Sequence, residues 1–403
     1  MIAQEILSKL IQPNASKLVL VVFDGLGGLP DEKTGRTELE SARHPNLDKF
    51  AEEGCSGLST PISPGITPGS GPSHLALFGY DPFRYEIGRG LLDTLGIEFP
   101  LRPGDVAARG NLATIDENGL LTDRRAGRIA TEKTSQLCKL LDEIVIDGIK
   151  FFVRPVKEHR VSVVMRGAGL SDKINDTDPQ KTGVKPLKAL GQTGDGRSEF
   201  TAGVVNKFLE VVGEKLAPHK PANYLLLRGF AEMITIPSFS EIYKVKAAAI
   251  AIYPMYRGLA RLLGMDVLPL PEDVAAEFRI LRENFSQYDF FFLHIKGTDS
   301  AGEDGDFARK VRVIEEADRY FSIFRELCPD VLVVTGDHST PAKLKGHSWH
   351  PVPFLLWSKA GRRDKTKKFG ESECRSGELG HFNARETMPL MLASAGRLLK
   401  FGA

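Results

Sequence analysis

The chain has 403 residues, of which 42% are hydrophobic and 26% are charged, and its formal net charge is +1. This length allows two or more domains, and the composition is that of an ordinary globular protein. Because the net charge is close to zero, no strong field attracts nucleic acid or an acidic membrane surface, and we expect neither as a partner.

The N-terminal segment predicts a short amphipathic helix that ends before Pro13. Polar residues interrupt the apolar core that a signal peptide needs, and no apolar stretch in the sequence is long enough to cross a bilayer. The four cysteines have no CxxC spacing, which favours reduced thiols over a disulfide framework. We therefore expect a cytoplasmic protein.

Three aspartates each follow a short, continuous apolar run that is typical of a buried strand in a parallel sheet. The runs are residues 18–23, 290–295 and 331–334, and the aspartates that follow them are Asp24, Asp299 and Asp337. Ligands of parallel sheets bind at the carboxyl ends of the strands, so we expect these carboxylates to converge on one edge. Carboxylates and imidazoles are ligands of Zn²⁺ and Mn²⁺, and His338 and His347 follow the last strand.

A helix is predicted over residues 45–53, followed by a loop rich in Pro, Gly, Ser and Thr over residues 60–72. Long loops of this kind in compact domains are often functional. Ser70 lies in it between two glycines, which allow a ligand to approach closely, and a helix predicted to open near Ser73 would direct N–H groups towards an anion. Ser70 is therefore a candidate nucleophile, although this segment taken alone is better explained as a flexible loop.

The middle of the chain, over about residues 103–243, differs in character from the rest. It has basic, polar stretches between short β-like pieces at 151–153 and 161–165, and it lacks strands that end in aspartate. We interpret it as an inserted domain that divides the core into residues 1–102 and 244–403.

The insert contains a set of basic side chains, and the arginines among them suit bidentate binding of phosphate or carboxylate. They are Arg109, Arg124, Arg125, Arg128, His159, Arg160 and Arg166. A solvated charged surface is the better explanation for any one of them taken alone. The run 123–128 is more specific, because its small residues would bring the guanidinium groups close to a single ligand.

The alternation of strands and helices resumes after the insert, which is typical of an α/β fold. A strand is predicted over 248–252, a helix over 256–263, and one long amphipathic helix over 307–327. This last helix would link the strand before Asp299 to the strand before Asp337, as a parallel crossover requires. Asp337-His338 alone is explained by a turn, but Asp24 and Asp299 at equivalent strand ends favour a metal site.

Several short segments in this order resemble the archaeal-type 2,3-bisphosphoglycerate-independent phosphoglycerate mutases, members of the alkaline phosphatase superfamily. The segments are 22–25 (VFDG), 68–70 (PGS), 74–82 (HLALFGYDP), 123–129 (DRRAGRI), 298–306 (TDSAGEDGD), 336–339 (GDHS) and 347–353 (HSWHPVP). The resemblance covers nearly the whole chain. It implies an alkaline-phosphatase-like α/β fold, in which helices sandwich a mostly parallel sheet and a smaller α+β domain is inserted.

The resemblance also implies two divalent metal ions, with Mn²⁺ or Mg²⁺ favoured and Zn²⁺ as the alternative. One ion would be bound by Asp24, Ser70, Asp337 and His338. The other would be bound by Asp299, His347 and a third residue four positions after Asp299. That residue is a histidine in many relatives and Glu303 in this chain, and its oxygen ligand favours the harder ions.

The implied activity is that of an isomerase of glycolysis and gluconeogenesis. Ser70 would take the phosphoryl group from 3-phosphoglycerate, and the resulting phosphoserine would return it to the 2-hydroxyl of glycerate without 2,3-bisphosphoglycerate. Substrate binding is expected from His74, Arg109, Arg124, Arg125, Arg128, His159 and Lys246. An exposed lysine at a strand edge explains Lys246 equally well.

Two other functions remain open on these residues. The first is that of another phosphomutase or phosphatase of the superfamily. Such an enzyme would have the same two-metal core, because the arginines of the insert decide the substrate. The second is that of a catalytically silent metal-binding relative. Nothing in the sequence predicts the oligomeric state.

Overall fold

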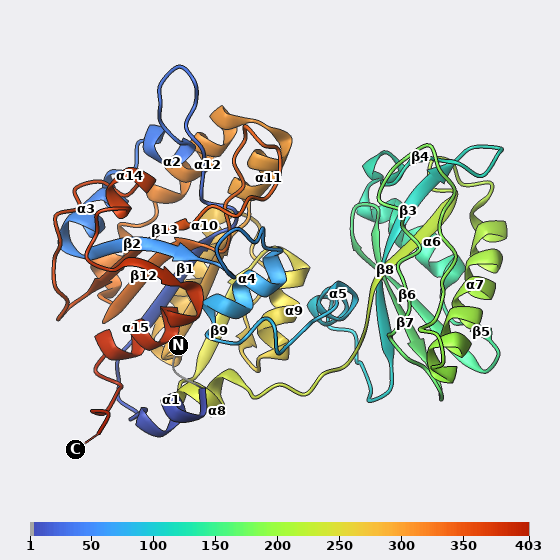
Figure 1. Ribbon diagram of the computed structural model, residues 1–403, viewed down its shortest axis with the longest axis horizontal. Coiled ribbons are helices and arrows are strands. Elements are labelled where there is room, and N and C mark those ends of the chain that lie inside the picture. Colours follow the sequence, from blue (N-terminus) through green and yellow to red (C-terminus); the bar gives the residue numbers. More distant parts are fainter. Residues whose placement is uncertain (1–3, 403) are drawn as a thin grey trace. The chain divides into compact units, whose positions relative to one another are not determined.

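The computed structural model describes residues 4–402, and the chain folds into two compact units. Unit 1 consists of the described parts of Met1–Glu86 and Ile236–Ala403, and unit 2 is Ile87–Thr235 (Figure 1). Unit 2 therefore begins and ends earlier along the chain than the insert expected over residues 103–243. It begins earlier because the helix α5 (Arg89–Gly96) packs on the strands of unit 2.

Unit 1 contains one eight-stranded sheet. Its spatial order is β10 (Asp266–Val267), β9 (Ala247–Ala251), β11 (Phe290–Ile295), β1 (Leu18–Phe23), β12 (Val331–Gly336), β13 (Val352–Ser358), β2 (Cys55–Thr60) and β14 (Gly380–Asn383). Strand β13 runs antiparallel to both of its neighbours, and the other neighbouring strands pair in parallel. This is the mostly parallel sheet that the sequence predicts.

The three strands that precede the aspartates lie side by side in the middle of the sheet, in the order β11, β1 and β12. Phe23 at the end of β1 lies opposite Ile295 of β11 and Gly336 of β12. The strands therefore end at the same level, and the residues that follow them emerge at one edge. Every residue of these three strands is buried, which explains their continuous apolar sequences.

Helices surround the sheet of unit 1. They are α1 (Gln4–Leu10), α2 (Glu38–Ser41), α3 (Pro45–Glu53), α4 (Ser70–Leu77), α8 (Phe239–Tyr243), α9 (Pro254–Leu262), α10 (Val274–Asn284), α11 (Gly297–Asp304), α12 (Phe307–Asp318), α13 (Ile323–Leu327), α14 (Glu371–Cys374) and α15 (Thr387–Ser394).

Both faces of the sheet carry helices (Figure 1). Alternate residues of β1, Val19 and Val21, share a hydrophobic core with side chains of α3, α10, α12 and α13. On the opposite face, the ring of Phe292 in β11 contacts the rings of His74 in α4 and Phe78 just after it. The sheet is therefore the middle layer of three.

The prediction of a single helix over residues 307–327 is wrong, because α12 ends at Asp318 and α13 begins at Ile323. Between them the backbone makes tighter bonds to the third preceding residue, among them Tyr320 N to Ala317 O and Phe321 N to Asp318 O. Phe321 and Phe324 are buried in the core all the same, so the apolar stripe marked the correct residues but not the break.

Unit 2 is built on a six-stranded antiparallel sheet. Its path is β4 (Leu121–Asp123), β3 (Val106–Ile115), β7 (Arg160–Arg166), β6 (Ile149–Lys157) and β5 (Ile144–Ile146), and β8 (Tyr224–Glu232) pairs with β3. The helices α6 (Thr131–Leu141) and α7 (Gly196–Leu216) share its hydrophobic core. The expected α/β fold with a smaller inserted α+β part is confirmed. Within residues 4–402, none of the helices has the length and apolarity needed to cross a membrane.

Candidate metal centre

Side chains that follow β1, β11 and β12 form two groups of potential metal ligands in unit 1. Asp24, Asp337 and His338 form the first group, and Asp299, His338 and His347 form the second. Within each group, the candidate ligand atoms lie within 4.8 Å of one another. His338 belongs to both groups, so the two candidate ion positions are neighbours. We call them the first and the second donor group.

Asp24 is fully buried, and its two carboxylate oxygens have different surroundings. Oδ2 accepts hydrogen bonds from the Tyr256 hydroxyl and from Lys296 Nζ at 2.8 Å, and it lies 3.4 Å from His294 Nε2. Oδ1 has no hydrogen-bond partner and lies 3.4 Å from His338 Nε2. Burial alone would raise the pKa of Asp24, but Lys296 and His294 hold this pKa well below its ordinary value.

Asp337 completes the first group from the end of β12. Its Oδ1 accepts a 3.0 Å hydrogen bond from Gly25 N, and its Oδ2 lies 3.1 Å from His74 Nδ1 and 3.2 Å from His338 Nε2. Burial would raise the pKa of this carboxyl group, but the two imidazoles lower it. Asp337 is therefore ionised in its buried position.

Asp299 is the carboxylate of the second group, in the first turn of α11. Its Oδ1 accepts a 2.9 Å hydrogen bond from Thr340 Oγ1 and lies 3.5 Å from His347 Nε2, while its Oδ2 is 2.5 Å from Lys296 Nζ. Burial and the charge of Asp24 would raise the pKa of Asp299, but His347 and Lys296 bring it to about 2.

The two histidines of the second group stack, with ring centroids 3.7 Å apart. The Nδ1 atom of His338 is 2.9 Å from Thr340 Oγ1, and the Nδ1 atom of His347 is 2.9 Å from the carbonyl oxygen of Pro68. Each contact fixes a ring so that Nε2 faces the carboxylates. Burial would lower the pKa of His347, but Asp299 and the Pro68 carbonyl raise it to about 9.

These residues fit a pair of divalent cations. Three ionised carboxylates are buried within one cluster, and among the described residues Lys296 is the ammonium that bridges two of them. A buried carboxylate oxygen without a partner, Oδ1 of Asp24, is costly unless a cation or a donor meets it. The set of carboxylate oxygens and imidazole nitrogens suits Mn²⁺ or Zn²⁺.

Ser70 lies beside the first donor group. It is the first residue of α4, which therefore begins three residues before the expected Ser73, and its Oγ lies 3.2 Å from His338 Nε2. Ser70 is 7% exposed, so its hydroxyl is sheltered but not sealed from solvent. The expected nucleophile thus lies next to His338, one of the expected ligands.

Three other expected site residues of unit 1 lie elsewhere or act differently. His74 is completely buried beneath Ser70, where its Nδ1 contacts the Ser70 carbonyl oxygen at 2.8 Å as well as Asp337. Glu303 lies one turn after Asp299 but is exposed and belongs to neither donor group of the described chain. Lys246 precedes β9 at the amino ends of the parallel strands, away from the aspartates, and its ammonium stands 4.5 Å from the Tyr288 ring centre.

The sequence did not single out four residues that contact the donor groups: Tyr256, His294, Lys296 and Thr340. Lys296 follows β11 directly, so the expected convergence of the strand ends could have predicted its place in the site. In β11, His294 faces the side of the sheet opposite to that of its two neighbours in the strand. In the sequence it was recognisable only as a polar residue within an apolar run. Tyr256 lies on α9, and no local pattern marked it.

Unit 2 holds the basic residues of the insert, and some of them surround His159. Burial and the nearby Arg160, Arg109, Arg125 and Arg128 lower the pKa of His159 to about 3. A neutral imidazole among four guanidinium groups suits an anion. Arg125 and Arg128 are exposed, whereas Arg109 is buried and pairs with Asp93 of α5 at 3.4 Å. We call these five residues the arginine cluster.

Two expected anion-binding arginines are instead bound to carboxylates of unit 2. Arg124 makes a two-point ion pair with Asp178, with N–O distances of 2.8 and 2.7 Å. Arg166 pairs with Asp105 at 2.6 Å. Their charges are therefore largely satisfied inside the unit.

Comparison of the sequence with known proteins points to one family. Residues 51–222 match the family model described as 2,3-bisphosphoglycerate-independent phosphoglycerate mutase. The chain is 50% identical to probable enzymes of that name from Thermus thermophilus and from Thermotoga maritima, over 99% of each chain.

Two solved structures share the fold. A protein from Pyrococcus horikoshii has a TM-score of 0.83 and 32% identity, covering 97% of this chain and 100% of its own. The cofactor-independent phosphoglycerate mutase from Thermoplasma acidophilum has a TM-score of 0.69 and 33% identity, covering 94% and 100%. The chain therefore belongs to the 2,3-bisphosphoglycerate-independent phosphoglycerate mutases, a family of isomerases.

Proposed function

We propose that the protein interconverts 3-phosphoglycerate and 2-phosphoglycerate through a phosphoserine at Ser70, with two divalent metal ions and without 2,3-bisphosphoglycerate. One observation carries the proposal: Ser70 Oγ lies 3.2 Å from Nε2 of His338, the residue common to both donor groups. A nucleophile at this point adjoins the cluster of buried, ionised carboxylates that fits divalent cations.

In this proposal, Asp24, Ser70, Asp337 and His338 would hold one ion, and Asp299 and His347 would hold the other. The two donor groups support this division, although they do not include Ser70, and His338 belongs to both. Bound divalent ions would stabilise the entering and leaving oxygens of a phosphoryl transfer. Glu303 is exposed, which does not support it as a further ligand. Mn²⁺ and Mg²⁺ are the ions we favour, and Zn²⁺ is the alternative.

The proposed reaction has two transfers that mirror each other. The oxygen of Ser70 bonds to phosphorus as its hydroxyl gives up one proton, and the bond from phosphorus to the C3 oxygen of the substrate breaks. The C3 oxygen takes up one proton in exchange for the one that Ser70 gave up, so the transfer consumes and releases none overall. Glycerate then presents its 2-hydroxyl, and the same exchange runs from phosphoserine to that oxygen. Lys296, held by Asp24 and Asp299, keeps a positive charge in the cluster throughout.

We assign recognition of the substrate carboxylate to the arginine cluster of unit 2. Within the described chain, Arg125 and Arg128 form no ion pair, and His159 is neutral by virtue of its low pKa. Guanidinium groups bind carboxylates with two parallel hydrogen bonds. Arg124 is occupied by Asp178, and Lys246 precedes the amino end of β9, so neither is part of this assignment. A place in glycolysis and gluconeogenesis and a cytoplasmic location belong to the same proposal.

The test is a coupled enolase assay with 3-phosphoglycerate, without 2,3-bisphosphoglycerate, on protein treated with EDTA and then supplied with Mn²⁺. We expect activity that returns with Mn²⁺, disappears in Ser70→Ala and persists in Ser63→Ala, a serine of the same loop outside the donor groups. Release of inorganic phosphate alone would instead support a phosphatase. A protein that binds metal but turns over no substrate would support the silent relative.

A further inference from the structure

The unequal surroundings of the Asp24 oxygens distinguish one side chain, Tyr256. The protein supplies Oδ2 with the Tyr256 hydroxyl and the Lys296 ammonium, whereas it leaves Oδ1 without a hydrogen bond. Oδ1 is also the oxygen nearest His338 Nε2, at 3.4 Å. The carboxylate is thus held by one oxygen and presents the other to the first donor group.

The direction of the Tyr256 hydroxyl is fixed by its surroundings. Tyr256 is 1% exposed on α9. Its ring stacks on the imidazole of His294, with centroids 3.7 Å apart and planes 29° apart, and it lies 4.7 Å from the imidazole of His74. A ring packed against two others cannot swing away from Asp24. Because a carboxylate only accepts hydrogen bonds, the hydroxyl must be the donor.

We infer that Tyr256 is a positioning residue of the metal centre: its hydroxyl holds Oδ2 of Asp24, so that Oδ1 alone serves as a ligand in the first donor group. The inference rests on the proposed metal binding by that group. Hydrogen bonds to a ligating side chain fix its orientation, and their removal typically lowers metal affinity by about 10- to 100-fold.

A substitution of Tyr256 is expected to affect one donor group selectively, whereas a substitution of Lys296, which also donates a hydrogen bond to Asp24, is not. Lys296 contacts both Asp24 and Asp299, so its replacement disturbs both groups. Among the candidate ligands of the described chain, the Tyr256 hydroxyl bonds to Asp24 alone. Its loss is therefore expected to weaken one ion and to spare the other.

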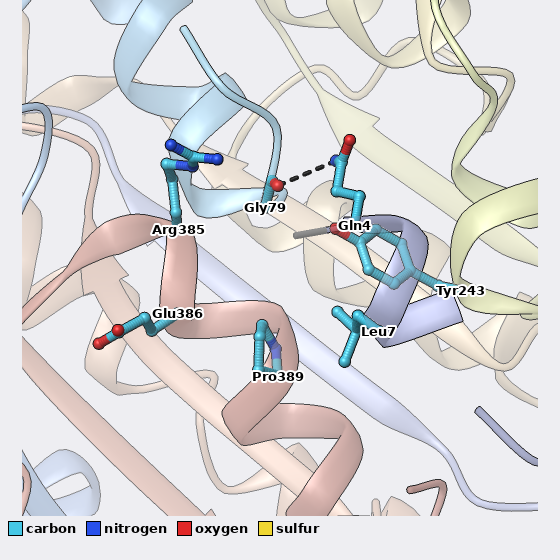
Figure 2. A pocket seen from close by; sticks show the side chains of 7 residues that line it. All are labelled: Gln4, Leu7, Gly79, Tyr243, Arg385, Glu386 and Pro389. Atoms are coloured by element: carbon cyan, nitrogen blue, oxygen red, sulfur yellow. Dashed lines mark hydrogen bonds between the residues drawn. The ribbon is translucent and has the colours of Figure 1, made fainter. Parts of the chain in front are cut away.

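Tyr243 offers a matched control. It is completely buried, and its hydroxyl donates a 2.7 Å hydrogen bond to the carbonyl oxygen of Phe78. Tyr243 lines a small cavity, about 20 Å³ in volume. Figure 2 shows it with the other residues that line this cavity, Gln4, Leu7, Gly79, Arg385, Glu386 and Pro389. No residue of either donor group lines this cavity. Tyr243→Phe thus removes an equally buried hydroxyl at a place that metal binding does not use.

The experiment titrates Mn²⁺ into metal-free full-length protein and measures free Mn²⁺ by electron paramagnetic resonance. Wild type, Tyr256→Phe and Tyr243→Phe are compared, and thermal melting of each metal-free protein is recorded. We expect two ions in every protein and an affinity about 10-fold lower for one ion in Tyr256→Phe only. Mutase activity of Tyr256→Phe should approach that of wild type as Mn²⁺ is raised, a rescue that general damage to the fold would not give.

The outcomes separate this inference from the proposed function. Two unchanged affinities in Tyr256→Phe would overturn the inference and leave the metal centre intact. Equal weakening of both ions, or the same loss in Tyr243→Phe, would assign the effect to folding and would overturn it as well. A wild-type protein that binds no Mn²⁺ would overturn the proposed function itself.

Discussion

The hydroxyl oxygen of Thr340 lies 2.9 Å from Oδ1 of Asp299. The same oxygen lies 2.9 Å from Nδ1 of His338, so one buried side chain links a carboxylate of the second donor group to the histidine that both groups share. The carbonyl oxygen of Thr340 accepts a 2.9 Å hydrogen bond from the buried Lys310 of α12. Thr340 is therefore held by Lys310 through its carbonyl oxygen, and its hydroxyl contacts two candidate ligands, Asp299 and His338.

Thr340→Val keeps the shape of the side chain but removes this link. We expect Mn²⁺ affinity to fall by about 10-fold or more, because a hydrogen-bonded partner of two ligands is lost. Thr366→Val is the matched control, since Thr366 is also buried and its hydroxyl bonds to Ser56 Oγ at 2.6 Å, outside the donor groups. Calorimetric titration of Mn²⁺ distinguishes them. Equal affinities in the two variants would show that Thr340 does not orient the ligands.

Gly25, directly after Asp24, is crowded by the same threonine. Its φ is +65°, and a Cβ atom on it would lie 2.4 Å from Thr340 Oγ1. Gly35 has a φ of +67° but no atom within 4 Å of a Cβ built there. We expect both alanine variants to lose about 1–2 kcal/mol of stability from the left-handed backbone. Only Gly25→Ala also has to displace Thr340.

Thermal melting and Mn²⁺ titration of Gly25→Ala and Gly35→Ala test this expectation. Gly25→Ala should melt at the lower temperature and bind Mn²⁺ more weakly, whereas Gly35→Ala should keep the affinity of wild type. If both variants lose only the same modest stability and neither loses affinity, the loop after β1 tolerates a displaced Thr340, and the close packing has no role in metal binding.

The sequence predicts those residues of the candidate site that follow the ends of buried strands. The runs before Asp24 and Asp299 match β1 and β11 residue for residue, because a strand buried on both faces must be apolar throughout. Once the strands are parallel and adjacent, the meeting of their carboxyl ends follows from geometry. For this reason the convergence of three aspartates was visible without a structure.

Contacts made across the fold were not visible in the same way. Asp178 lies in a sequence typical of a turn, yet it is buried and forms a two-point pair with Arg124, some fifty residues away in the chain. Tyr256 reaches Asp24 from a helix whose pattern predicts only burial. Such partners are chosen by tertiary packing, which local periodicity does not encode.

Arg124 and Arg128, which lie four residues apart in unit 2, should respond differently to substitution. Arg128→Gln removes an exposed charge of the arginine cluster, and we expect the KM for 3-phosphoglycerate to rise by about 10-fold, the value of one charge-assisted hydrogen bond. Arg124→Gln leaves Asp178 buried without its partner, so stability should fall by about 1–3 kcal/mol with little change in KM. Steady-state kinetics and thermal melting measure both. A higher KM in Arg124→Gln alone would reverse the two assignments.

Glu277, a buried residue of α10 with no hydrogen bond to either carboxylate oxygen, should make stability depend on pH. Burial raises the pKa of Glu277 well above its ordinary value, and the Asp273 carboxylate raises it further. The folded state therefore holds this proton more tightly than the unfolded chain, whose glutamates have a pKa of about 4.3. The contribution of Glu277 to stability is greatest below that pH and is lost as the pH rises through the folded pKa.

Glu277→Gln keeps a neutral side chain at every pH. We expect it to match the wild type at low pH and to exceed it by about 1–3 kcal/mol at pH 8, because the variant no longer needs to bury an unpaired charge or to bind a proton. Glu283→Gln, an exposed position on the same helix, is the control and should change little at any pH. Urea unfolding of metal-free proteins between pH 5 and pH 8 measures the difference. A constant difference between Glu277→Gln and wild type across this range would mean that Glu277 does not change its protonation on unfolding, and a smaller difference at pH 8 than at pH 5 would reverse the sign argued from its burial.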